Sequence, residues 1–231
     1  MENHIDNPHS AQGRVHDWKE SAHSHFERWA DHYDRDLINI VLFDPTHRRV
    51  LTQLRQWRRW GATGLRMLDI GCGTGSLLLK AARIEGLLEL GQGLDMSANM
   101  VSYAQEKASR AGQEGRVRFL VGDAEHLPFE AGTFDVVTCC NSFHHYPHQD
   151  RAVAQMRRVL RPGGYVVIVD GYRDDPWGWF IFDVCVARAE KHVHHCSAAR
   201  FRRLFGQAGL REMHQHVFGV CPPVLFNRGR K

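Results

Sequence analysis

The sequence predicts an α/β protein built around a doubly wound, mostly parallel sheet. Apolar strands alternate with helical segments between residues 65 and 170, which is the pattern of βαβ units with right-handed crossovers. The first strand runs directly into Gly71-Cys72-Gly73-Thr74-Gly75 and then into a helix. Glycines let the backbone approach a ligand, and the N–H groups of a helix N-terminus suit an anionic or hydrogen-bonding one. We therefore expect the ligand at this turn.

Composition limits the classes of protein that the chain can be. Its 231 residues, 43% hydrophobic and 24% charged with a formal net charge of +4, suffice for one sizeable core in a soluble protein. The basic residues form no concentrated stripe, so nucleic acid is not favoured as a partner. Six cysteines without CxxC spacing favour a reducing cytoplasm. No apolar run approaches the roughly 18 residues of a membrane span.

The N-terminal region predicts an arm followed by two helices. Residues 1–16 are polar and predict a disordered arm. Apolar residues at three-to-four spacing predict a helix over 17–33. A second helix is expected over 45–60, with Asp44 as its N-cap and Pro45 at its first position.

The rest of the chain completes a single predicted domain, 17–231, in which residues 17–62 form a helical cap. A ligand-binding core spans 63–170, with strands at 65–70, 90–94, 117–121, 134–140 and 165–169 and helices at 76–86, 97–112 and 150–160. A turn is expected at 161–164. The region 171–231 predicts helices at 177–193 and 198–208 and strands at 211–218 and 224–227. Its first part, 171–196, does not repeat the earlier units and is expected to determine substrate specificity.

Acidic residues follow the second and third strands of the predicted sheet. Ligands of doubly wound folds lie across the carboxyl ends of the strands. Asp95 can accept hydrogen bonds from ribose hydroxyls, although it can also cap the next helix. Asp123 can accept a hydrogen bond from the exocyclic amine of an adenine, while the Ala124 backbone N–H donates one to a ring nitrogen. Met96 can lie against the ring face or simply fill the core.

Five ordered strings resemble motifs of class I S-adenosylmethionine-dependent methyltransferases, in particular the small-molecule group of ubiquinone/menaquinone C-methyltransferases. They are LDIGCGTG, GLDMS, GDAEHLPF, FDVV and LRPGG, at 68–75, 93–97, 122–129, 134–137 and 160–164. Residues 26–34 also resemble the entry helix of that group. These strings are specific for the cofactor and much less so for the methyl acceptor.

The resemblance implies a seven-stranded sheet of order 3-2-1-4-5-7-6 with the last strand antiparallel. It implies S-adenosylmethionine as the cofactor, with Gly71 and Gly73 near its methionine part and the backbone of Asn141 beneath it. Asp95 would hold the ribose, and Asp123 and Ala124 the adenine. The full expected cofactor-binding set is Asp69, Gly71, Cys72, Gly73, Gly75, Asp95, Met96, Asp123, Ala124 and Asn141. Asp69 is expected mainly to organise the turn.

Other functions have weaker support. The fingerprint of nicotinamide dehydrogenases needs a third glycine where this chain has Ser76. Nucleic-acid amino-methyltransferases carry an Asn/Asp-Pro-Pro-aromatic string after strand four, where this chain has Asn141-Ser142-Phe143-His144. Methylation of arsenite would need several converging thiolates. A cofactor-binding protein without catalysis remains an alternative, because a fold alone does not prove a reaction.

Methyl transfer from a sulfonium is an in-line displacement that depends chiefly on positioning, worth roughly 7–11 kcal/mol. A general base adds about 10²–10⁴-fold when the nucleophile arrives protonated. His144 and His145 follow the fourth strand, where this fold brings the acceptor to the methyl group, and are the candidate bases. They can alternatively cap the next loop. The expected acceptor is a small aromatic or apolar molecule, methylated at C, O or S.

A second histidine cluster, His192, His194, His195 and Cys196, lies in the C-terminal region. Metal ligands usually come from separated segments, and adjacent residues on a helix point apart. We therefore expect no metal at this cluster, which can line the acceptor pocket or lie on the surface.

Overall fold

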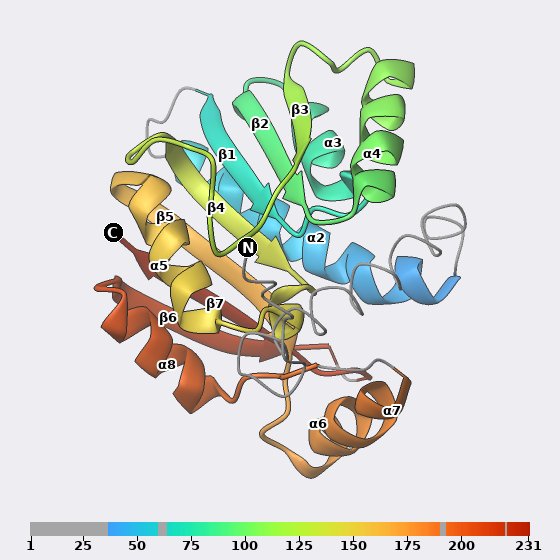
Figure 1. The fold of residues 1–231 in the computed structure, drawn as a ribbon, viewed down its shortest axis with the longest axis vertical. Coiled ribbons are helices and arrows are strands. Elements are labelled where there is room, and N and C mark those ends of the chain that lie inside the picture. Colours follow the sequence, from blue (N-terminus) through green and yellow to red (C-terminus); the bar gives the residue numbers. More distant parts are fainter. Residues whose placement is uncertain (1–36, 60–63, 190–192, 220) are drawn as a thin grey trace, which may run out of the picture.

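Residues 37–59, 64–189, 193–219 and 221–231 are described by the structure, a computed structural model. The arm expected over 1–16 and the helix expected over 17–33 lie outside these residues. Seven strands form one sheet in the order β3-β2-β1-β4-β5-β7-β6, and Figure 1 shows it twisting through the middle of the molecule. β7 is antiparallel to both of its neighbours, and all other pairs are parallel. The order and the antiparallel last strand implied by the resemblance are confirmed.

The strands lie where the apolar segments predicted them, with small changes at their ends. Their bounds are β1 Leu65–Ile70, β2 Leu88–Asp95, β3 Val117–Val121, β4 Phe134–Cys140, β5 Leu160–Gly171, β6 Arg211–Phe218 and β7 Val224–Arg230. The helices are α2 Leu37–Arg59, α3 Ser76–Ala82, α4 Ala98–Arg110, α5 Gln149–Val159, α6 Pro176–Trp179, α7 Ala187–Ala189 and α8 Ala198–Gln207. A 3-10 turn, η1 (Phe143–His145), follows β4, and a π-helical stretch, η2 (Phe180–Val186), joins α6 to α7.

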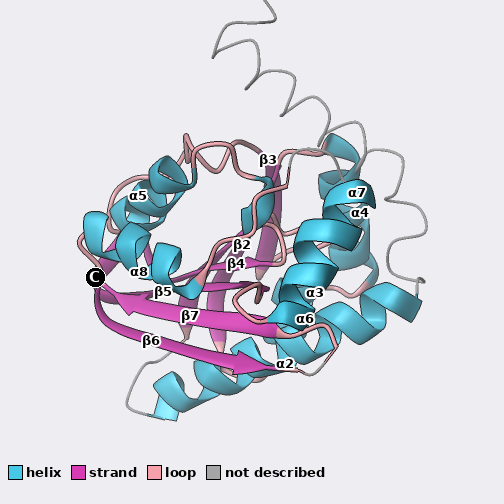
Figure 2. Cartoon of the chain, turned by 90° about the horizontal axis from the view of Figure 1, so that it is seen from below, coloured by secondary structure: helices cyan, strands magenta, loops and turns pink. Residues whose placement is uncertain are grey.

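Successive side chains of the central strands enter two different cores, because a strand turns alternate residues to opposite faces. Met67 and Val136 pack with residues of α2, α3 and α4. Leu68 and Val137 pack with residues of α5 and α8. Figure 2 shows the corresponding three layers, with α5 and α8 on one side of the sheet and α2, α3 and α4 on the other.

Three predicted boundaries are wrong. α2 begins at Leu37, so Pro45 lies inside the helix and Asp44 is no N-cap. The helix continues on the N-terminal side of Pro45, although proline inside a helix loses one backbone hydrogen bond. The turn expected at 161–164 is an irregular start of β5, in which Leu160 already pairs with Phe134. The single helix expected over 177–193 is divided by η2, and Val193 lies outside any helix.

Candidate functional site

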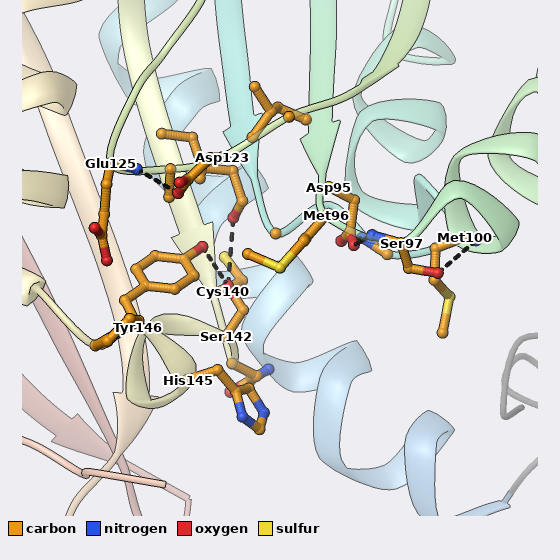
Figure 3. A pocket seen from close by; sticks show the side chains of 18 residues that line it. Asp95, Met96, Ser97, Met100, Asp123, Glu125, Cys140, Ser142, His145 and Tyr146 are labelled. Carbon is orange, nitrogen blue, oxygen red and sulfur yellow. Dashed lines mark hydrogen bonds between the residues drawn. The ribbon is translucent and has the colours of Figure 1, made fainter. Parts of the chain in front are cut away.

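A pocket opens at the carboxyl ends of β1, β2 and β4, where the sequence places the polar strand ends. Figure 3 shows Asp95 and Met96 on one side of it and Ser142 and Tyr146 on the other, with His145 at its edge. The pocket is lined by Ile70, Gly71, Gly73, Leu94, Asp95, Met96, Ser97, Met100, Gly122, Asp123, Ala124, Glu125, Cys140, Asn141, Ser142, His145, Tyr146 and Pro147. Seven of the ten expected cofactor-binding residues are among these.

The glycine turn presents its backbone to the pocket. Gly71 and Gly73 have φ of +65° and +50°, a left-handed backbone conformation that residues other than glycine rarely adopt. A Cβ at Gly71 would lie 2.1 Å from Ser142 Oγ, whereas a Cβ at Gly73 would meet nothing within 4 Å. Gly71 is therefore needed by the protein's own packing, and the space beside Gly73 is left open for a ligand.

Asp95 connects the glycine turn to the following helix. Its Oδ2 accepts the backbone N–H of Gly73 at 2.8 Å, and its Oδ1 accepts that of Ser97 at 3.0 Å. Ser97 Oγ in turn caps α4 by accepting the N–H of Met100. These bonds hold the Asp95 carboxylate, a hydrogen-bond acceptor, at the edge of the pocket.

The third strand end supplies a second acidic edge. Asp123 Oδ1 accepts the N–H of Glu125 at 2.9 Å, which fixes the loop around Ala124. Glu125 is 4% exposed, and its Oε1 accepts the N–H of His148 at the start of α5. Glu125 was not expected from the sequence. Its position four residues after the end of β3 gave no signal that it joins this loop to the start of a helix 23 residues later.

Three expected cofactor residues do not line the pocket. Cys72 is buried, and burial raises the pKa of its thiol well above the ordinary value. A Cβ on Gly75 would lie 2.5 Å from the ring of Phe119, so this glycine allows close packing beneath the turn. Asp69 is 3% exposed and accepts the hydroxyl of Thr138 at 2.6 Å. Burial raises the pKa of Asp69 to about 7, against the effect of the Thr138 hydrogen bond.

The segment after β4 borders the same pocket. Asn141 has a left-handed φ of +53°, and its Nδ2 is buried without a hydrogen-bond partner among the described residues. Ser142 Oγ and Tyr146 OH lie 3.0 Å apart and share a hydrogen bond. Ser142 was missed as a pocket residue, although its place directly after Asn141 was a usable signal. A free amide N–H group and an open space at Gly73 fit a ligand with hydrogen-bond acceptors.

The two candidate bases occupy different places. His145 lines the pocket, with its ring centroid 4.2 Å from that of His144. His144 is 8% exposed, lies behind the pocket, and has its Nδ1 2.7 Å from Asp170 Oδ1. Burial opposes ionisation of Asp170, but His144 holds the pKa of that carboxyl below its ordinary value. His195 stacks on His144 at 4.4 Å, and burial together with His144 lowers its pKa to about 3.

Residues after Pro147 contribute nothing to the lining of this pocket in the described part of the chain. The expectation that 171–196 determines substrate specificity therefore stays a prediction. Two of its aromatic residues, Trp177 and Trp179, are each 52% exposed. Among the described helices, none is long and apolar enough to cross a membrane.

Comparison with known proteins identifies similar chains. The family model described as "Methyltransferase domain" matches residues 68–168. A ubiquinone/menaquinone biosynthesis C-methyltransferase from Stutzerimonas stutzeri is 36% identical over 141 residues, which cover 58% of this chain and 52% of that protein. The chain thus spans about half the length of this relative. A demethylmenaquinone methyltransferase from Lactiplantibacillus plantarum is 30% identical over 221 residues, 84% of this chain and 89% of that protein.

Solved structures agree with the fold. The crystal structure of magnesium protoporphyrin IX methyltransferase from Synechocystis, with bound SAH, has a TM-score of 0.74 to this chain. The similarity covers 92% of this chain and 99% of the other at 18% sequence identity, so it bears on the fold alone.

Proposed function

Because the chain belongs to the class I methyltransferase family that includes the ubiquinone/menaquinone C-methyltransferases, we propose that it transfers a methyl group from S-adenosylmethionine to a small molecule. One observation carries the proposal. The open space beside Gly73, the carboxylate of Asp95 and the unpartnered Nδ2 of Asn141 all border one pocket. The open space beside Gly73 and the donor Nδ2 of Asn141 fit the carboxylate of such a cofactor, and the acceptor oxygens of Asp95 fit its ribose hydroxyls.

The proposed cofactor contacts divide by position. The backbone of Gly71 and Gly73 would hold the methionine part, with Asn141 beneath it. Asp95 would accept the ribose hydroxyls in charge-assisted hydrogen bonds, each worth about 1.5–3 kcal/mol. Asp123 and the Ala124 amide would read the adenine edge, with Met96 against its face. Asp69, Cys72 and Gly75 would act indirectly by shaping the turn that presents these groups.

When bound, S-adenosylmethionine supplies an activated methyl group, and the chain supplies position and a proton acceptor. We propose that the methyl acceptor reaches the cofactor past Tyr146 and His145, which border the pocket together with Asn141. His145 would remove a proton from a hydroxylated aromatic ring, whereas His144 would support His145 from behind. The similar proteins are a C-methyltransferase of ubiquinone/menaquinone biosynthesis and a demethylmenaquinone methyltransferase, which supports a methyl acceptor of the quinol type methylated at carbon.

The alternative acceptors gain no support from this pocket. Burial raises the pKa values of the Cys72, Cys139 and Cys140 thiols, so these side chains offer no thiolate cluster for arsenite. Nucleic acid would require a basic surface beside the pocket, and its lining includes Asp95, Asp123 and Glu125 but no lysine or arginine. All six cysteines are free, which fits our proposal of a cytoplasmic location.

The test measures production of S-adenosylhomocysteine from S-adenosylmethionine with a panel of quinols and phenols. We expect turnover with at least one acceptor, and a loss of about 10²–10⁴-fold in kcat for His145→Ala. The deficit should shrink at alkaline pH, where the acceptor ionises without help. His148→Ala is the matched control, because the His148 side chain forms no capping hydrogen bond and lies outside the pocket lining.

Absence of turnover with every acceptor, in a protein that binds the cofactor, would favour a non-catalytic binding protein. Equal turnover by His145→Ala and the native protein at all pH values would eliminate the proposed base.

A further inference from the structure

Three side chains that commonly bind metals meet behind the pocket. They are His144 on η1, Asp170 near the end of β5, and His195 just before α8. One ligand atom from each lies within 4.8 Å of the others. The side chains come from three separate segments of the chain, and all are nearly enclosed, with exposed fractions of 8%, 1% and 7%.

The backbone around this cluster is fixed by its own hydrogen bonds. The N–H of His194 donates to the carbonyl of His144 at 2.8 Å, which joins the two histidine segments directly. Gln149, itself 3% exposed, donates through Nε2 to the carbonyl of His194 at 2.9 Å and to that of Phe143 at 3.3 Å. The ring of Phe182 covers His195 at a centroid distance of 4.7 Å. The three side chains are therefore held together in the protein interior by the surrounding backbone and side-chain contacts.

The carboxylate in this cluster has an unused acceptor. Asp170 Oδ1 accepts the N–H of Gly171 at 2.8 Å and lies 2.7 Å from His144 Nδ1. Asp170 Oδ2 is buried and has no hydrogen-bond partner among the described residues. An unsatisfied buried acceptor costs about 1–3 kcal/mol, and more when it is charged. A cation coordinated by this oxygen would remove that cost.

We propose that His144, Asp170 and His195 bind a first-row divalent metal ion of the Zn²⁺ type. Two imidazoles and one carboxylate are an established donor set for such ions, with a remaining position open to water. The rings of His144 and His195 stack with 21° between their planes. A shared metal therefore requires one ring to turn about its Cβ–Cγ bond, which is a soft torsion.

The bound ion would connect the C-terminal helical region to the pocket. It would tie the segment before α8 to η1 and β5 through three ligands. His145 follows His144 in the chain, and the two rings lie 4.2 Å apart. The ion would thus fix the orientation of the pocket histidine without contacting the cofactor. Any effect on turnover rests on the proposed function, whereas binding of the ion does not.

The test is titration of the metal-free full chain with Co²⁺, followed by competition with Zn²⁺. We expect one Co²⁺ ion to bind per chain, with the d–d absorption bands of a site of low coordination number made of nitrogen and oxygen ligands. Added Zn²⁺ should displace this ion. Asp170→Asn and His195→Gln should each weaken this site by about 100-fold or more, since even outer partners of metal ligands contribute 10–100-fold. His194→Gln is the matched control, because His194 is an exposed neighbour whose backbone carries the structural hydrogen bonds.

The comparison between variants separates this site from exposed histidines, because Asp170→Asn and His195→Gln keep every exposed histidine of the native chain, whereas His194→Gln removes one and keeps the proposed site. Circular dichroism and S-adenosylhomocysteine binding confirm that each variant is folded. If Asp170→Asn does not fold, His195→Gln alone decides the question. Absence of a low-coordinate Co²⁺ spectrum in the native chain, or the same spectrum in His195→Gln, would overturn the proposal. Neither outcome depends on methyl transfer.

Discussion

Two glycines in left-handed backbone, Gly73 and Gly112, differ in what surrounds them. Neither would place a Cβ within 4 Å of another atom, but only Gly73 borders the pocket. Alanine in this conformation costs roughly 1–2 kcal/mol at either position. We expect Gly73→Ala and Gly112→Ala to lose similar stability, while Gly73→Ala alone loses cofactor affinity by more than about tenfold, or ~1.4 kcal/mol. Calorimetry and urea unfolding measure both quantities. Equal affinities would mean that no ligand occupies the space beside Gly73.

The raised pKa of Asp69 makes the free energy of unfolding depend on pH. Its pKa is raised to about 7 in the folded protein, chiefly by burial, against about 3.9 in an unfolded chain. Between these values the folded state keeps a proton that the unfolded state has released, so this contribution to stability falls as pH rises, by at most about 1.4 kcal/mol per pH unit. Asp69→Asn removes the titration and keeps an acceptor for Thr138. Urea unfolding from pH 5 to 8 should show the native protein losing stability relative to Asp69→Asn. Parallel curves for the two proteins would contradict the raised pKa.

At the scale of single residues, the sequence identified chemistry better than direction. The acids and glycines were found because their types and spacing are unusual at strand ends. Spacing could not tell that Asp69 points into the core, or that His144 points away from the pocket while His145 lines it. The directions of the two histidines depend on how η1 turns after β4, where His144 contacts the distant Asp170.

Among the elements, α2 packs on the sheet through buried aliphatic residues and one aromatic contact. Trp57 is 6% exposed and stacks on Tyr165 of β5, with ring centroids 4.3 Å apart and 7° between the planes. Trp57→Ala should lower the free energy of unfolding by about 3–5 kcal/mol. Trp177→Ala is the control, since half of that side chain is exposed, and should change stability by less than about 1 kcal/mol. Urea unfolding followed by circular dichroism measures both. Equal midpoints for the two variants would show that α2 does not depend on this stacking.

The strands were predictable because the central ones are buried on both faces and read as short apolar runs bounded by glycines and acids. The ends of the helices were less predictable than the strands. Asp44 and Pro45 form a typical helix start, yet Asp44 instead pairs with Lys80 of α3 at 2.8 Å. A local signal was overruled by a tertiary contact. Likewise, Gly163 and Gly164 indicated a turn, but both lie in the irregular start of β5, where Gly163 N–H donates to the carbonyl of Lys231 and the Gly164 carbonyl accepts the N–H of Lys231.

Across the whole molecule, the sheet order came from the resemblance of five strings to a known family, because periodicity alone predicts strands and not their neighbours. The histidine and aspartate cluster behind the pocket could not be predicted at all. Asp170 lies 26 residues from His144, and His195 lies between the helices expected over 177–193 and 198–208, where the sequence predicted no element. Only the folded chain brings these three side chains together.

The central claim is that the pocket at the carboxyl ends of β1, β2 and β4 binds S-adenosylmethionine. Calorimetric titration with S-adenosylhomocysteine tests it most directly, using the native chain, Asp95→Ala and, as a control, Asp150→Ala on the exposed first turn of α5. We predict one site in the native chain and in the control, and an affinity at least about 10-fold weaker in Asp95→Ala, since each charge-assisted bond lost is worth 1.5–3 kcal/mol. No binding by the native chain, or equal affinity in all three proteins, would contradict the account.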